Sequence, residues 1–375
     1  MDNLTHMLLG ATIGQAVGRR RLGWVALVAG AAANTVPDLD VIPLAFVSDA
    51  LAEWRDHRGL SHSLWFGAVV GPILGWACWR LFRRRSGDPR GADAALKAWI
   101  TVWTASMIVH PLLDMSTIYG TQILLPFSDV RYDIPAVGII DPFYTVILLL
   151  AVILGCTVRR WSTPISWIAL LCSTSYLVYG WGQNQITATE ARRQLAVQGT
   201  VGVDLHAYTT IFQPWLRRIV VNEPWGIRVG FLSSAAPRPV DWFCFARPAD
   251  PAIARLQDSE AGRTLDWFSG GQTWPVVDRQ ADGSVRVSLL DTRYGAPGAT
   301  VLGWWGVAAH YAADGRVIEP PHRIGIARGA SWALVRSLWP ASWGDNAPLY
   351  AASGVSLPAQ PPAGAPTGCR TMDVR

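Results

Sequence analysis

The sequence predicts an α-helical membrane bundle of about six spans, followed by an extracytoplasmic β-rich α+β domain. Half of the 375 residues are apolar, only 16% are charged, and the mean hydropathy is +0.22. Long apolar runs are typical of membrane helices, and here they end near residue 182. The length suits two domains, so we expect a transmembrane domain at 1–184, a soluble domain at 185–356 and a disordered tail at 357–375.

Six apolar segments are candidate membrane spans, near residues 4–18, 24–47, 61–82, 97–115, 138–158 and 163–182. The first would rise only about 22 Å against a hydrocarbon core of about 30 Å, so we expect a short or re-entrant helix there. The second contains Pro37, Asp38 and Asp40, which favour a broken helix that lines a cavity. The N-terminus lacks the features of a cleavable signal peptide, so the first spans themselves should direct insertion.

The basic residues predict how these spans are oriented. Loops after the first, third and fifth spans contain eleven Lys or Arg residues, whereas loops after the second and fourth contain three. Because Lys and Arg accumulate in cytoplasmic loops, the N-terminus and everything after the sixth span should face outward. The net charge of +5 does not indicate a nucleic-acid partner, because the basic residues lie mainly in short loops between apolar segments.

The residues after 185 predict a small α+β or β-sandwich domain. Residues 183–198 are rich in Ala, Arg and Gln and predict a helix that leaves the sixth span, and a further helix is expected over 251–262. The expected strands include 201–212, 217–221, 227–232 and 242–246. Two Ala-Asp-Gly turns, at 281–283 and 313–315, predict β-hairpins.

Two of the five cysteines, Cys244 and Cys369, lie in the C-terminal part of the chain, and the other three lie in apolar spans. Outside the cytoplasm these two could form one disulfide. Nothing in the sequence places them close together, so the pairing stays open.

Four short clusters of metal-type ligands interrupt the apolar half of the chain. They are Asp2-Asn3-Leu4-Thr5-His6, Pro37-Asp38-Leu39-Asp40, His57-Arg58-Gly59-Leu60-Ser61-His62 and His110-Pro111-Leu112-Leu113-Asp114. A charged group at mid-bilayer costs roughly 2.5–3.5 kcal/mol on insertion scales, so such groups persist when they pair, bind an ion or perform chemistry. The predicted topology places all four clusters near the outward face, which indicates one shared metal site.

His110 and Asp114 are four residues apart, so a helix presents both on one face; the alternative for this pair is a buried hydrogen bond. Asp38 and Asp40 would point about 200° apart on a regular helix and could share a site only if the helix breaks near Pro37. Otherwise one is a ligand and the other orients it, and we favour Asp40 as the ligand. An exposed turn is the simpler alternative for this cluster.

His57 and His62 can converge if Gly59 and Ser61 form the turn before the third span, in which case Ser61 is a candidate helix N-cap. Arg58 could bind a phosphate or carboxylate group, or pair with a neighbouring acidic residue. Asp141 opens the fifth span, where a role at the site competes with simple capping of the helix.

The whole set predicts a divalent-metal centre. The expected metal ligands are His6, Asp40, His57, His62, His110 and Asp114, and the expected catalytic residues are Asp38, Arg58 and Asp141. Histidine with carboxylate and no thiolate suits zinc, which we favour, or manganese or iron. Six candidates exceed the three or four protein ligands of one catalytic zinc, so we expect one or two ions. Such a site activates water, with a free carboxylate as the general base.

These motifs, in this order, resemble the YdjM-like family of predicted membrane-bound, metal-dependent hydrolases. The resemblance covers about residues 1–182 and includes Pro126-Phe127-Ser128 and Ile140-Asp141-Pro142. It implies functional roles for His6, Asp38, Asp40, His57, Arg58, His62, His110, Asp114 and Asp141. The ligand pattern is also distantly similar to zinc-dependent phospholipase C, although this chain lacks the N-terminal Trp ligand of those enzymes.

Together these observations predict a multi-pass inner-membrane hydrolase whose metal site opens to the extracytoplasmic face. The lipid bilayer is then its partner, and a phosphoester or lipid-like molecule that reaches the site from the membrane surface is the expected substrate. The alternative is a membrane transport or binding protein that holds a metal without hydrolysis. A transport pathway requires polar groups at several depths, whereas the ionisable groups here cluster near one face, which favours the enzyme.

Overall fold

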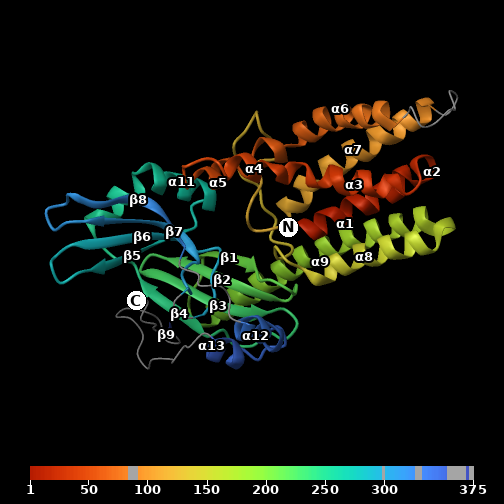
Figure 1. The fold of residues 1–375 in the computed structure, drawn as a ribbon. Helices are drawn as coiled ribbons and strands as arrows, with labels where there is room; N and C mark the ends of the chain where they lie inside the picture. The colour runs from red at the N-terminus through yellow and green to blue at the C-terminus, as the bar shows by residue number, and fades with distance from the viewer. Residues whose placement is uncertain (83–91, 298–299, 326–331, 353–368, 371–375) are drawn as a thin grey trace. The chain divides into compact units, whose positions relative to one another are not determined.

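The computed structural model of the protein describes residues 1–82, 92–297, 300–325, 332–352 and 369–370 (Figure 1). The chain divides into two compact units. The first contains Met1–Val47 and Asp56–Trp181, and the second contains Ser48–Arg55 and Gly182–Arg375. The predicted disordered tail, 357–375, lies outside the described residues except for Cys369 and Arg370.

The first unit is helical. Its elements are α1 (Asn3–Ile13), η1 (Gly14–Gly18), α2 (Arg19–Leu22), α3 (Val25–Thr35), η2 (Pro37–Asp40), α4 (Val41–Leu44), η3 (Leu60–His62), α6 (Leu64–Phe82), α7 (Ala92–Met115), α8 (Pro142–Thr157), η6 (Arg159–Trp161) and the first part of α9 (Ser162–Val197). Figure 1 shows α2 and the connection between α8 and α9 at one end of this bundle, with the N-terminus at the other.

The prediction of six spans is wrong, because fewer than six of the described helices are long and apolar enough to cross a membrane. Among the described residues, only Leu64–Phe82 and Asp93–Met115 are long and apolar enough to cross a membrane. A third span is obtained if α3 and the following Pro37–Leu44 segment, bent by 42°, count as one. The other expected spans fall short because α1 has 11 residues, α8 has 16, and polar residues such as Ser173 and Thr174 interrupt the apolar part of α9. The break expected at Pro37 is present.

Helices α1 and α3 pack with their backbones in contact. A methyl group added at Gly10 would lie 2.1 Å from the carbonyl oxygen of Gly30, and one added at Gly30 would lie 2.0 Å from that of Gly10. Small residues allow this approach between membrane helices. The crossing holds the start of α1, which carries His6, beside the end of α3, which carries Asn34.

The second unit contains the two predominantly antiparallel sheets that the β-rich prediction requires. One sheet has the order β1-β2-β3-β4-β9, in which β9 is parallel to β4, and the other has the order β5-β6-β7-β8. The strands are β1 (Asp204–Thr209), β2 (Leu216–Glu223), β3 (Gly226–Ser233), β4 (Trp242–Ala246), β5 (Thr273–Arg279), β6 (Val285–Asp291), β7 (Trp305–Tyr311), β8 (Val317–Gly325) and β9 (Cys369–Arg370). Both Ala-Asp-Gly turns join antiparallel neighbours, and Gly283 and Gly315 supply the positive φ that each turn needs.

Helices complete the second unit. They are α5 (Ala52–Asp56), whose last residue begins the next part of the first unit, α10 (Pro251–Gln257), α11 (Glu260–Ser269), α12 (Trp332–Ser342) and α13 (Ala347–Ala352). The predicted helix at 251–262 is two helices. The first, α10, ends at Gln257, and Ser259 caps the start of α11 by accepting a hydrogen bond from the Gly262 amide. Trp54 stacks on Phe268 at 5.3 Å, which joins α5 to this unit.

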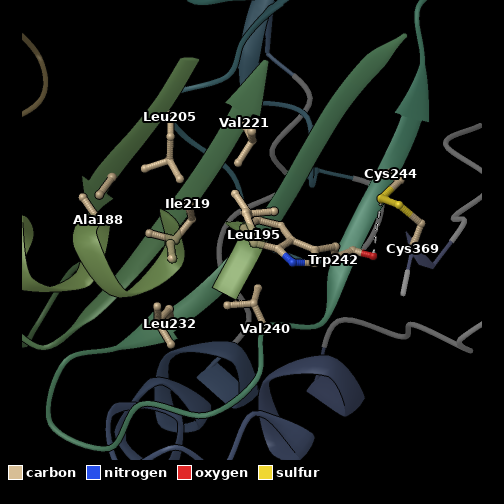
Figure 2. Packing of buried hydrophobic residues seen from close by; sticks show 12 residues of the cluster. Ala188, Leu195, Leu205, Ile219, Val221, Leu232, Val240, Trp242, Cys244 and Cys369 are labelled. Carbon is tan, nitrogen blue, oxygen red and sulfur yellow. Dashed lines mark hydrogen bonds between the residues drawn. A yellow bond between two sulfur atoms is a disulfide. The ribbon is translucent and has the colours of Figure 1, made fainter. Parts of the chain in front are cut away.

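The core beside the first sheet is formed by strand residues and the end of α9 (Figure 2). Ala188, Ala191 and Leu195 of α9 pack against Ile219 and Trp242 of the sheet. This part of α9 lies in the segment predicted to be a helix that leaves the last span.

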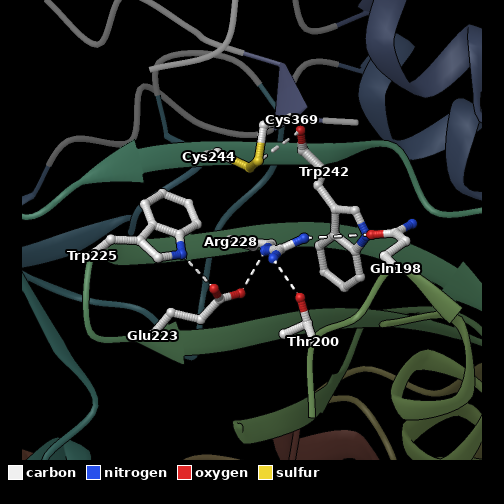
Figure 3. Close-up of a disulfide and its surroundings, with 8 residues drawn as sticks. All are labelled: Gln198, Thr200, Glu223, Trp225, Arg228, Trp242, Cys244 and Cys369. Atoms are coloured by element: carbon white, nitrogen blue, oxygen red, sulfur yellow. Dashed lines mark hydrogen bonds and ion pairs between the residues drawn. A yellow bond between two sulfur atoms is a disulfide. The ribbon is translucent and has the colours of Figure 1, made fainter. Parts of the chain in front are cut away.

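Cys244 of β4 and Cys369 of β9 form a disulfide, which resolves the pairing that the sequence left open (Figure 3). The bond joins positions 125 residues apart in the chain. On one face of the same sheet, Glu223 accepts hydrogen bonds from Arg228 and Trp225.

Candidate metal centre

Four side chains from three elements of the first unit converge on one point. They are Asp38 of η2, His62 of η3, and His110 and Asp114 of α7, and each offers a ligand atom within 4.8 Å of the others. The side chains of His62, His110 and Asp114 are buried, whereas Asp38 is 14% exposed. We call these four residues the central cluster.

Local structure explains why they meet. His110 and Asp114 share one face of α7, as their spacing predicted. The helical path of α3 ends at Thr35, and a 3₁₀ turn begins at Pro37, whose ring fits the first position of a helical turn. This turn directs Asp38 toward the two histidines, with Oδ1 at 3.3 Å from His62 Nε2 and 3.4 Å from His110 Nε2.

The hydrogen bonds of His110 determine which ring nitrogen faces the centre. Its Nδ1 lies 2.6 Å from the backbone oxygen of Asn34, which can only accept, so Nδ1 carries the proton. Nε2 then presents its lone pair to the cluster. It lies 3.1 Å from His62 Nε2 and 3.3 Å from Asp114 Oδ2.

The same reasoning applies to His62. The Ser61 hydroxyl donates to Asp40 Oδ2 at 2.9 Å, so its oxygen accepts from His62 Nδ1, which lies 3.0 Å away. His62 Nε2 is thereby left to face His110, Asp38 and Asp114. In these tautomers two nitrogen lone pairs and two carboxylate oxygens face one another, and a cation among them removes the repulsion. The side chains therefore fit a metal ion.

His6 and Arg58 contact the cluster from outside, through Asp114. Asp114 Oδ1 lies 3.2 Å from His6 Nε2 and 3.0 Å from Arg58 Nη2, and it also contacts the Met1 amino group. Its other oxygen, Oδ2, faces the histidines and has no hydrogen-bond partner among the described residues. His6, an expected ligand, is thus placed where it orients Asp114. Asp2, in the same motif, caps α1.

Arg58 is buried and held on several sides. Besides Asp114, it contacts Thr117 Oγ1 at 3.1 Å and lies 4.6 Å from the centroid of the Tyr119 ring. Its ion pair is therefore with Asp114 and not with the neighbouring acids considered from the sequence. Its φ of +60° lies in the left-handed region, which is unusual for a residue other than glycine.

Asp38 and Asp40 occupy the reverse of the positions expected from the sequence. Asp38 belongs to the central cluster, while Asp40 lies beside it, 2.9 Å from His57 Nδ1 and 3.4 Å from His62 Nδ1. In a 3₁₀ turn, residues two apart point about 240° apart around the axis, and the two carboxylates lie against different ring nitrogens of His62. His57, another expected ligand, contacts Asp40 and is outside the cluster.

Two further expectations differ from the structure. Ser63 rather than Ser61 caps α6, because its Oγ accepts from the Phe66 amide at 3.1 Å. Asp141 caps α8 through the amides of Phe143 and Tyr144, and it also accepts a hydrogen bond from the Tyr176 hydroxyl. Of the two roles considered for Asp141, the structure shows the contacts of a helix cap.

Asn34, which contacts both His110 and His6, was not among the residues expected from the sequence. Its signal was available, because a buried amide within an apolar helix requires hydrogen-bond partners. Thr117 and Tyr119, which hold Arg58, follow α7 and had no comparable signal.

Helical packing and a buried histidine–aspartate cluster define a helical membrane protein with a candidate metal site. The chain belongs to the YdjM inner membrane protein family, whose sequence profile matches residues 1–186 and so includes the whole central cluster. The family resemblance recognised from the motifs is confirmed.

Two curated relatives are similar to part of the chain. Inner membrane protein YbcI of Escherichia coli (strain K12) is 33% identical over 136 residues, which are 35% of this chain and 71% of that protein. The uncharacterized protein YfhP of Bacillus subtilis (strain 168) is 29% identical over 163 residues, or 40% of this chain and 45% of that protein. No solved structure matches the chain.

Proposed function

We propose that this protein is a membrane-bound, metal-dependent hydrolase. The observation that carries the proposal is the central cluster, in which hydrogen bonds from outside direct two imidazole lone pairs toward two carboxylates. Two histidines and two aspartates with no thiolate favour zinc, with manganese and iron as alternatives. Four convergent ligand atoms suit one ion better than two.

The residues around the cluster have separable roles in this proposal. A bound divalent ion supplies Lewis acidity and an activated water at neutral pH. Asp38 is the most exposed member of the cluster, and its Oδ2 has no hydrogen-bond partner among the described residues. We therefore assign Asp38 the role of holding the proton taken from water. Arg58 and His6 fix the orientation of Asp114, and Asp40 fixes His62.

Exposure indicates the side from which a substrate enters. Asp38, Asp40 and His57 are 14–18% exposed, whereas His6 of α1 and Asp114 of α7 are buried. A substrate would therefore approach along the η2 side of the cluster. Since the unit belongs to an inner-membrane family, a phosphoester or lipid-like molecule at the bilayer surface is the proposed substrate class.

Two observations support an extracytoplasmic orientation of the site and of the second unit. Five arginines of α2 and η6 lie at the end of the bundle opposite the N-terminus, and Lys and Arg accumulate on the cytoplasmic side of membrane proteins. The Cys244–Cys369 disulfide is typical of an oxidising compartment. A reporter fused after residue 190 tests this proposal, which requires activity of the periplasmic and not the cytoplasmic reporter.

Metal analysis of the purified full-length protein tests the site. We expect about one equivalent of metal in the wild type and in His57→Ala, and little in His110→Ala or Asp38→Ala. His57→Ala is the matched control, because His57 is close to the cluster but outside it. Equal metal content in all four proteins would show that the cluster holds no metal and would remove the basis of the proposal. A proton on one Nε2 atom would then take the place of the cation among the facing acceptor atoms.

Hydrolysis is tested separately, with a panel of phosphomonoesters, phosphodiesters and phospholipids. The proposal requires activity that a chelator abolishes and added zinc restores. Normal metal content without hydrolysis, together with metal flux in proteoliposomes, would instead support the transport alternative.

A further inference from the structure

A second polar feature of the first unit lies at the end of the bundle opposite the central cluster. It is a cavity of about 530 Å³ between α2 and the connection from α8 to α9. Four arginines line it: Arg19, Arg20, Arg159 and Arg160. From His6 to Arg19 the helical path rises about 20 Å, most of the thickness of a hydrocarbon core. The two features are therefore separate sites.

Packing in the bundle brings α2 close to the connection between α8 and α9. The Gln15 side chain of η1, four residues before Arg19, accepts a hydrogen bond of 3.0 Å from the Ser166 hydroxyl of α9. Gln15 also contacts the Val152 carbonyl of α8. Gly23, with a φ of +64°, allows the chain to turn directly after α2. The arrangement of the four arginines therefore depends on buried contacts within the bundle, and not on the loops alone.

The charge of the cavity is not balanced by the protein. Among the described residues, no acidic side chain lines the cavity and no ion pair involves any of the four arginines. One nitrogen of Arg19, Nη1, is buried and has no hydrogen-bond partner there. The N-terminus of α9, a helix of 36 residues, adds partial positive charge at Ser162. Several donors and an uncompensated positive field favour an anion.

The surroundings indicate which anion. Arginine binds phosphate bidentately, and the cavity volume is within the range of small-ligand pockets. Trp24 and Trp161 beside the cavity are 68% and 53% exposed, as expected of side chains at a membrane interface. Basic pockets between membrane helices on the cytoplasmic side suit anionic lipid headgroups. We propose that this cavity binds the phosphate group of an anionic phospholipid of the cytoplasmic leaflet.

Lipid binding to the full-length protein in detergent tests the proposal by native mass spectrometry. We expect phosphatidylglycerol to bind at least about tenfold more tightly than phosphatidylcholine, and Arg19→Gln with Arg159→Gln to remove most of that preference. The matched control is Arg21→Gln with Arg80→Gln, which removes the same charge from exposed positions that do not line the cavity. This control should retain the preference.

The remaining arms distinguish the sources of phosphate and the effect of charge alone. Inorganic phosphate should compete only weakly, because it lacks the glycerol and acyl contacts; equal affinity for phosphate and phosphatidylglycerol would overturn the lipid assignment. Arg19→Lys with Arg159→Lys keeps the charge and should fold even if the glutamine variant does not, yet it should weaken lipid binding because bidentate geometry is lost. An equal loss in the cavity and control variants would overturn the proposal, since the effect would then be one of net charge.

Discussion

The two units bury charged groups in different ways. In the second unit two buried arginines have carboxylate partners: Arg293 forms a bidentate contact with Asp291, and Arg228 pairs with Glu223. In the first unit the central cluster directs two histidine nitrogens and two carboxylates at one another, and in the tautomers assigned above none of the four ligand atoms is a donor. A buried charged side chain that is paired with its neighbours is structural. A buried group of side chains whose acceptor atoms face one another without a donor indicates a bound ligand.

Arg218 shows what a buried charge costs in the second unit. Burial lowers the pKa of its guanidinium to about 9, against the opposing effects of Tyr208 and Asp291. The side chain donates to the carbonyl oxygens of Thr292 and Val301, at 3.0 and 2.6 Å. Backbone acceptors thus replace part of the lost hydration, while its Nη1 has no hydrogen-bond partner among the described residues.

The largest expected effect follows from Asp114→Ala. This change removes a ligand and leaves the buried Arg58 unpaired, so we expect loss of metal and a destabilisation of about 3–5 kcal/mol. His110→Ala should also lose the metal but be destabilised less, because no buried arginine loses its partner. Thermal unfolding in detergent, with and without chelator, measures both. A chelator effect in Asp114→Ala as large as in the wild type would contradict the comparison.

Asp291→Ala tests the structural side of the comparison. Arg293 would lose its partner in a buried setting, so we expect a destabilisation of about 3–5 kcal/mol with unchanged metal content. Replacing both residues, Asp291→Leu with Arg293→Met, should recover much of that stability, because apolar groups need no partner. If the double variant did not recover stability, the Asp291–Arg293 pair would have a role besides neutralising each other's charge.

Removing the disulfide should affect the second unit only. Cys244→Ser with Cys369→Ser should cost about 2–5 kcal/mol of stability, because the bond closes a long loop in the unfolded chain. Metal content should stay at the wild-type value. The oxidised wild type treated with a reductant is the control, and it should unfold at the same temperature as the variant.

Much of the central cluster could be predicted because its residues contrast with their surroundings. His62, His110 and Asp114 stand in or beside apolar helices, where an ionisable group requires a reason. The exchange of Asp38 and Asp40 could not be predicted, since it depends on a 3₁₀ turn that the residues alone do not specify. The β-rich second unit followed from turn residues and strand composition. The span count failed because hydropathy does not give the length of a helix, and α1 and α8 have only 11 and 16 residues.

Asp40→Asn tests whether contacts outside the cluster tune it. Asp40 accepts from Ser61 and lies against His62 Nδ1, so it helps to hold the ring in the tautomer that presents Nε2 to the centre. Loss of such a partner weakens metal affinity about 10–100-fold. Competition with a chelator of known affinity measures this, and we expect unchanged stoichiometry. Unchanged affinity would show that Asp40 serves only His57.

The smallest effect separates two serines two residues apart. Ser63→Ala removes the cap of α6 and should cost about 1 kcal/mol of stability with metal affinity unchanged. Ser61→Ala should leave helix stability nearly unchanged but weaken metal binding, because it removes the hydroxyl between His62 and Asp40. Unfolding and metal competition on both variants give a two-way comparison. If both substitutions changed only stability, or both changed only metal affinity, the two serines would not have the separate structural and metal-site roles that we assign to them.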